Sequence, residues 1–112
     1  YNQGVAFSHR IADAYGVPIV TYFQPSLYTR DLPVDDGVIE YMNITDAELS
    51  RDLFAQVRPL LDPAVHDVAD CLDGLDAEVY WDDIHHNERA ADVIAGCVYA
   101  DLAPQLQALA AG

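Results

Sequence analysis

The segment VPIVTYF, residues 17–23, constrains the fold more than any other part of the sequence. It is a short run of β-branched and aromatic residues, which is typical of a strand buried on both faces. The preceding residues 1–15 place apolar side chains at helical spacing, and Gly16 and Pro18 are signals that end a helix. A helix followed by a buried strand is typical of a parallel α/β sheet, so the sequence predicts an α/β fold.

A second helix is predicted from Thr45 onward. Thr45 and Glu48 have the spacing of a capping box, in which each side chain binds a backbone N–H at the helix start. Pro59 removes a backbone donor and should kink or shorten the last turn. The apolar face of this helix consists of Leu49, Leu53, Val57 and Leu60 or Leu61.

A long C-terminal helix is predicted to begin after Asn87, a favourable N-cap, with Glu88 at its positive end. Pro104 should kink or end this helix, which leaves residues 105–112 as a continuation or a fraying tail. Its predicted buried face consists of Ala91, Ile94, Ala95, Val98 and Leu102.

Three connections are less regular. Residues 24–37 contain two prolines and a glycine and predict a long loop of the kind that often borders a binding site. Residues 62–74 fit either a short helix or a strand, and the pattern does not choose between them. Residues 78–81, EVYW, predict a short extended segment.

The composition fits one domain over residues 1–112, because 52% of the residues are hydrophobic and no linker-like segment interrupts the chain. Five arginines, no lysine and 19 acidic residues give a net charge of −14. This charge makes contact with nucleic acid or an anionic membrane unfavourable. No segment approaches the roughly 20 apolar residues of a membrane span, and nothing in the sequence assigns a compartment.

Cys71 and Cys97 are the two cysteines of the chain. They lack the paired spacing of a zinc site or a redox motif, so no metal or cofactor is predicted from them. An oxidising compartment would favour a disulfide between them, and a reducing one would favour two buried thiols. The sequence leaves both alternatives open.

The segment WDDIHHNERAADVIA, residues 81–95, contains two overlapping pairs of acid and histidine, Asp82 with His85 and Asp83 with His86. An aspartate three residues before a histidine in a loop can hold one imidazole nitrogen and leave the other free to transfer a proton. The spacing fits both pairs equally, and in so acidic a chain it is weak evidence by itself.

Two other interpretations use the same residues. The four side chains can be ordinary loop residues, with the acids favouring the turn and the helix N-terminus. They could also bind a metal, but consecutive histidines diverge and no further ligand is evident in the sequence. The remaining histidines, His9 and His66, are expected to be surface or packing residues.

Read from His85, the segment resembles the last conserved block of the SGNH (GDSL-type) serine hydrolases. That block runs Asp, two variable residues, His, then Asn or Thr two positions later and commonly Gly five positions after His. Asn87 and Ala90 occupy these two positions, with Ala in place of the usual Gly, and the His86 register does not fit. Residues 15–29 and 67–83 also resemble segments of these hydrolases, although less specifically. The resemblance implies a flavodoxin-like three-layer α/β/α fold with a parallel sheet.

The same resemblance implies that His85 is the general base, that Asp82 orients it, and that Asp83 and His86 are neighbours at the rim. The family also uses a nucleophilic serine and oxyanion donors, and no serine here lies in a strand-to-helix turn. Residues 1–112 are therefore expected to be the C-terminal part of an ester hydrolase, inactive alone and without a cofactor.

The substrate is expected to be a small-molecule, lipid or sugar ester, and Tyr22, Phe23 and Tyr28 can form either an acyl-binding wall or part of the core. The alternatives are a non-catalytic interaction module and a flavodoxin-like domain that binds a metal or small ligand.

Overall fold

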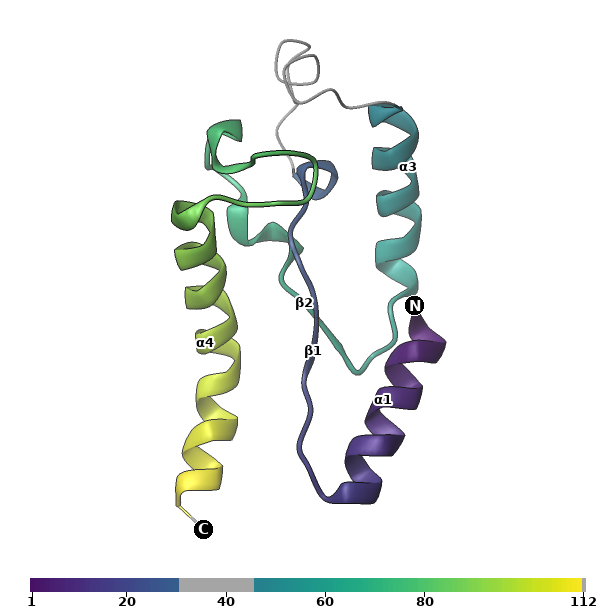
Figure 1. Cartoon of the computed structure of the whole chain (residues 1–112), viewed down its shortest axis with the longest axis vertical. Helices are drawn as coiled ribbons and strands as arrows, with labels where there is room; N and C mark the ends of the chain where they lie inside the picture. The colour runs from purple at the N-terminus through teal and green to yellow at the C-terminus, as the bar shows by residue number, and fades with distance from the viewer. Residues whose placement is uncertain (31–45, 112) are drawn as a thin grey trace.

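The computed structural model describes residues 1–30 and 46–111, in which α- and 3-10 helices accompany a two-stranded sheet. The elements in chain order, with η for a 3-10 helix, are α1 (Asn2–Tyr15), β1 (Thr21–Phe23), η1 (Leu27–Thr29), α3 (Ala47–Val57), η2 (Arg58–Leu60), β2 (Val65–Asp67), η3 (Ala69–Leu72), η4 (Ala77–Val79) and α4 (Glu88–Ala110). The strands pair in parallel, and in Figure 1 they run between α4 on one side and α1 and α3 on the other. The predicted α/β class and the parallel pairing are confirmed.

Helix α1 ends where the sequence predicts. Gly16 adopts a left-handed conformation with φ of 64°, which a glycine reaches without steric cost. The backbone N–H groups of Gly16 and Val17 donate to the carbonyl groups of Asp13 and Ala12. These bonds satisfy the last carbonyl groups of the helix and turn the chain toward β1.

Strand β1 is shorter and less buried than predicted. Its three residues are all partly buried, and Val17 and Ile19 before it are 57% and 39% exposed. The prediction of a strand over residues 17–23 that is buried on both faces is therefore wrong for the described residues, among which β1 has β2 as its only paired strand.

Helix α3 begins at Ala47 after Asp46, whose side chain makes no capping hydrogen bond. Thr45, the other half of the predicted capping box, lies outside the described residues. At the end of the helix the chain tightens into η2, which contains Pro59, so the predicted shortening of the last turn is confirmed. Phe54 packs against Phe23 and Tyr28 and joins the helix to β1 and η1.

The structure shows which conformation the three less regular connections adopt. Residues 62–74 form β2 followed by η3, so the strand alternative applies to their first half. The extended segment predicted at residues 78–81 is wrong, because η4 occupies Ala77–Val79 and only Tyr80 forms an isolated bridge, with His86. The long loop predicted at residues 24–37 contains η1, and its residues 31–37 lie outside the described part of the chain.

Helix α4 begins as predicted, but its buried face differs. The Asn87 side chain accepts a hydrogen bond from the Ala90 backbone N–H at 3.1 Å, which confirms the N-cap. Ala90 is completely buried, whereas Ala91 and Ala95 are exposed, so the predicted face is wrong by one position at the start of the helix. The reason is that α4 packs here against η3 and η4, which lie on the Ala90 side.

The prediction that Pro104 could end α4 is wrong. The helix continues through Pro104 to Ala110. Pro104 lacks the N–H that would bond to the carbonyl of Ala100, and both residues are exposed. Water can therefore take the place of the missing donor, and the helix continues.

The core lies where α4, η3 and η4 meet η1. Its buried members are Leu27, Leu72, Val79, Tyr80 and Ala90. Cys71 of η3 and Cys97 of α4 form a disulfide beside this core, with their Cα atoms 6.4 Å apart. The structure thus selects the disulfide from the two alternatives for the cysteines.

By length and composition alone, α4 is long and apolar enough to cross a membrane. One such helix is weak evidence by itself, although none of its apolar window is buried within the described structure. The helix also carries Asp92 and Asp101. The prediction that the chain contains no membrane span therefore remains a prediction.

Candidate active site

The candidate site lies on a tight loop of residues 81–87 between η4 and α4. The loop closes on itself, because the backbone N–H of Trp81 donates to the carbonyl of His85 and that of Asn87 donates to the carbonyl of Val79, each at 2.9 Å. The Asn87 amide group also donates to the carbonyl of Glu78 at 2.8 Å. The residue that caps α4 therefore also closes the loop.

Asp82 and His85 form a hydrogen-bonded pair within this loop. The Oδ2 atom of Asp82 lies 2.6 Å from Nδ1 of His85. The Oδ1 atom accepts from the backbone N–H groups of His85 at 2.7 Å and Ile84 at 2.9 Å. These backbone donors and then the His85 side chain lower the pKa of Asp82 to about 2.

The charge of Asp82 determines which nitrogen of the His85 imidazole carries the proton. An ionised carboxylate only accepts hydrogen bonds, so Nδ1 of His85 carries the proton and Nε2 of the neutral ring has a free lone pair. The side chain of His85 is 70% exposed, and within residues 1–30 and 46–111 its only hydrogen-bonding side chain is Asp82. This arrangement can accept a proton from a group that approaches from outside the loop.

The second acid and histidine pair is not formed. Asp83 accepts a hydrogen bond from the Tyr28 hydroxyl at 3.0 Å, and its carbonyl accepts from the backbone N–H of Leu27 at 3.0 Å. The His86 ring packs against Tyr80 with ring centroids 4.9 Å apart. Burial lowers the pKa of His86, although the nearby backbone of Pro25 opposes part of this effect. His86 is therefore a packing residue, and Asp83 anchors the loop.

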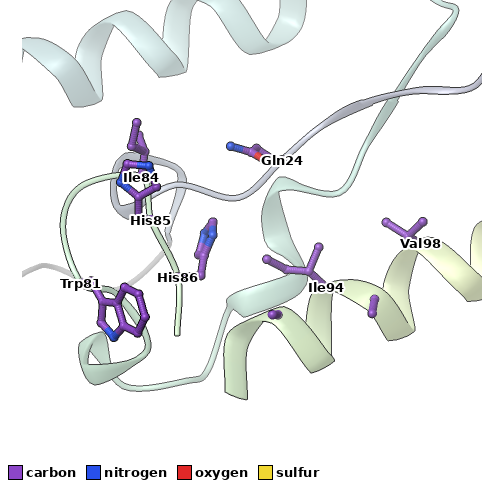
Figure 2. A pocket seen from close by; sticks show the side chains of 9 residues that line it. Gln24, Trp81, Ile84, His85, His86, Ile94 and Val98 are labelled. Carbon is purple, nitrogen blue, oxygen red and sulfur yellow. The ribbon is translucent and has the colours of Figure 1, made fainter. Parts of the chain in front are cut away.

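A groove of about 530 Å³ borders His85. Figure 2 shows the loop residues on one side of it, α4 on the other and Gln24 at its edge. The lining is mainly apolar and comprises Gln24, Trp81, Ile84, His85, His86, Ala91, Ile94, Ala95 and Val98. Several residues of the predicted buried face of α4 therefore line this groove.

The aromatic residues considered for an acyl-binding wall lie elsewhere. Tyr22 and Phe23 line a neighbouring hollow of about 290 Å³ that shares Gln24 and Ile84 with the groove. Tyr28 is buried, and its hydroxyl is bound to Asp83. Of the three, only Tyr22 and Phe23 lie close enough to the groove to contribute to a wall.

A polar cluster that the sequence did not predict joins the strands to α4. The Oδ2 atom of Asp101 lies 2.5 Å from Nδ1 of His66 and accepts from the Tyr22 hydroxyl at 2.6 Å. The pKa of Asp101 is lowered, first by the Tyr22 hydroxyl, and that of Tyr22 rises to about 12, first through desolvation. Strand pairing brings Tyr22 beside His66, and the placement of α4 brings Asp101 to both, so sequence spacing carried no signal.

Metal binding has no visible basis in the described part of the chain. No group of three or more His, Cys, Asp or Glu side chains gathers there in a way that could hold an ion. His9 contacts Thr21 at 3.2 Å, and His66 contacts Asp101.

Comparison with known proteins adds no relative to this description. No family model matches the chain, and no curated protein or solved structure shows significant similarity to it.

Proposed function

We propose that this chain supplies the base half of a serine ester hydrolase, in which His85 is the general base and Asp82 its orienting acid. The observation that carries the proposal is the 2.6 Å contact between Asp82 Oδ2 and His85 Nδ1 on an exposed ring whose Nε2 has no hydrogen-bond partner among the described residues. Support also comes from the resemblance of residues 81–95 to the SGNH hydrolase block.

In the proposed reaction, Nε2 of His85 takes the proton from a serine hydroxyl as its oxygen attacks the ester carbonyl. The resulting imidazolium then gives this proton to the leaving alcohol, and a water molecule repeats the sequence to release the acid. Asp82 keeps the proton on Nδ1 and stabilises the imidazolium by its negative charge. Such a positioned base contributes about 10²- to 10⁴-fold to the rate.

The nucleophile and the oxyanion donors belong, in this proposal, to a further segment of polypeptide. Isolated two-stranded sheets are only marginally stable, and parallel sheets normally have both faces covered. Yet large apolar side chains are exposed here on helices and on the approach to β1, including Phe7, Ile11, Val17, Tyr99 and Leu109. Further parallel strands would cover such surfaces and complete a flavodoxin-like three-layer fold.

The lining of the groove indicates the polarity of the substrate group that would lie beside His85. Ile84, Ile94 and Val98 give it an apolar lining, and His85 stands at one side. An ester whose acyl or alcohol group is apolar fits this lining better than an ester whose group there is charged.

The test is hydrolysis of a short-chain p-nitrophenyl ester by the complete polypeptide that contains these residues, with His85→Ala and His86→Ala compared side by side. We expect His85→Ala to lower kcat by at least about 10²-fold, and His86→Ala, which removes a ring from the groove lining but not the base, to lower kcat much less per folded molecule. Equal losses per folded molecule, or full activity of His85→Ala, would contradict the assignment.

The exposed apolar surface also favours a second candidate, a non-catalytic interaction module. The assay separates the two, because such a module would show no turnover sensitive to His85. Sequencing the complete reading frame for a serine in a strand-to-helix turn gives an independent answer.

A further inference from the structure

Asp83, which the SGNH resemblance leaves without a role, connects the candidate base loop to the rest of the protein. Among the residues that the structure describes, the hydrogen bonds of Asp82 stay inside the loop, since they join it to Ile84 and His85. Asp83 reaches outward instead, to the segment that follows β1. Its carbonyl and its carboxylate each accept one hydrogen bond from neighbouring residues of η1.

The two donors are well suited to hold the loop. Leu27 is 1% exposed and Tyr28 is 7% exposed, so both are fixed in the core. The Tyr28 ring packs against Phe54 of α3, with ring centroids 5.6 Å apart. Burial and the Asp83 carboxylate raise the pKa of Tyr28, so its hydroxyl remains a donor at neutral pH.

We propose that Asp83 and Tyr28 are positioning residues for His85, which hold the loop so that Asp82 keeps the imidazole in its Nδ1–H form. This inference rests on the proposed function, in which the free Nε2 atom of His85 is the base. In this proposal Asp82 orients the imidazole ring of His85, and Asp83 orients the loop that carries both residues.

The test uses nitrogen-15 NMR of the imidazole rings in the complete polypeptide that contains these residues, in alkaline solution where a histidine ring is neutral. Tyr28→Phe removes only the hydroxyl, and Asp83→Ala removes its acceptor. We expect either variant to lower the ratio of Nδ1–H to Nε2–H tautomers of His85 about fivefold, as for one lost hydrogen bond. Asp83→Asn keeps an oxygen acceptor and should retain most of the native ratio.

Tyr22→Phe is the matched control, because it removes the same kind of bond, from a tyrosine hydroxyl to an aspartate, at Asp101 on α4. It should leave the His85 tautomers unchanged. The inference is overturned if Tyr28→Phe and Asp83→Ala keep the native ratio, or if Tyr22→Phe lowers it equally. The readout needs no turnover, so failure here is distinguishable from failure of the proposed function, which would show as His85→Ala with undiminished hydrolysis.

Discussion

At the scale of single residues, the behaviour of Asp82 follows from the donors around one carboxylate. Two backbone N–H groups and one imidazole N–H surround its oxygens. These donors stabilise the ionised form although the residue lies at the surface, since hydrogen bonds to a charge are stronger than those to a neutral group. An ionised Asp82 in turn keeps the proton of His85 on Nδ1.

This environment predicts an unusually acidic Asp82. Its pKa of about 2 lies below the ordinary aspartate value of about 3.9, so its hydrogen bonds stabilise the fold above about pH 4 and are lost as the pH falls toward 2. Carbon-13 NMR of the Asp82 carboxyl group should give a titration midpoint near 2. In His85→Ala the midpoint should stay well below 3.9, because the backbone donors contribute most. A native midpoint near 3.9 would contradict the described hydrogen bonds.

At the scale of elements, Asn87 at the start of α4 both caps the helix and closes the preceding loop. The Oδ1 atom of Asn87 caps the helix at Ala90, and its Nδ2 atom closes the loop at Glu78. The completely buried Ala90 lies one turn into the helix, where η3 and η4 pack against it. A small residue is therefore required there, which gives a packing reason for alanine at this position.

Asn87→Ala should lower the free energy of unfolding by about 1 kcal/mol, the typical contribution of an N-cap. Urea denaturation followed by circular dichroism measures this change. Asn87→Ser is the control, because serine retains a capping oxygen but loses the bond to Glu78. Equal destabilisation in both variants would show that the Glu78 bond, rather than the cap, carries the effect.

At the scale of the whole molecule, most of the core lies within the covalent ring that the disulfide closes. The bond between Cys71 and Cys97, which are 26 positions apart, closes a loop that contains the candidate site. The buried residues Leu72, Val79, Tyr80 and Ala90 belong to the same ring, and Leu27 completes the cluster from outside it. The sheet and α3 contribute little to this cluster and leave much apolar surface exposed.

Removal of the disulfide should therefore be costly. For a separation of 26 residues, the chain-entropy model gives a loss of roughly 3 to 4 kcal/mol in the free energy of unfolding. Urea denaturation of the Cys71→Ser/Cys97→Ser double variant measures this loss. Alkylation of the native protein in denaturant without reductant is the control, and it should detect no free thiol. Two reactive thiols, or unchanged stability of the variant, would refute the prediction.

The sequence by itself determined what depends on neighbouring residues. The end of α1 at Gly16, the shortening at Pro59 and the cap at Asn87 are local signals, and each was predicted correctly. The two possible acid and histidine pairs were also evident, because a separation of three residues in a loop is local.

Only the tertiary structure decided which pair forms. The hydroxyl of Tyr28, 55 positions earlier in the chain, donates a hydrogen bond to Asp83, which therefore does not pair with His86. The His86 ring packs against Tyr80 instead. The buried face of α4, the strand at residues 65–67 and the cluster of Tyr22, His66 and Asp101 likewise depend on partners distant in sequence. Periodicity shows that a helix has an apolar face, but the elements that pack against it decide which residues are buried.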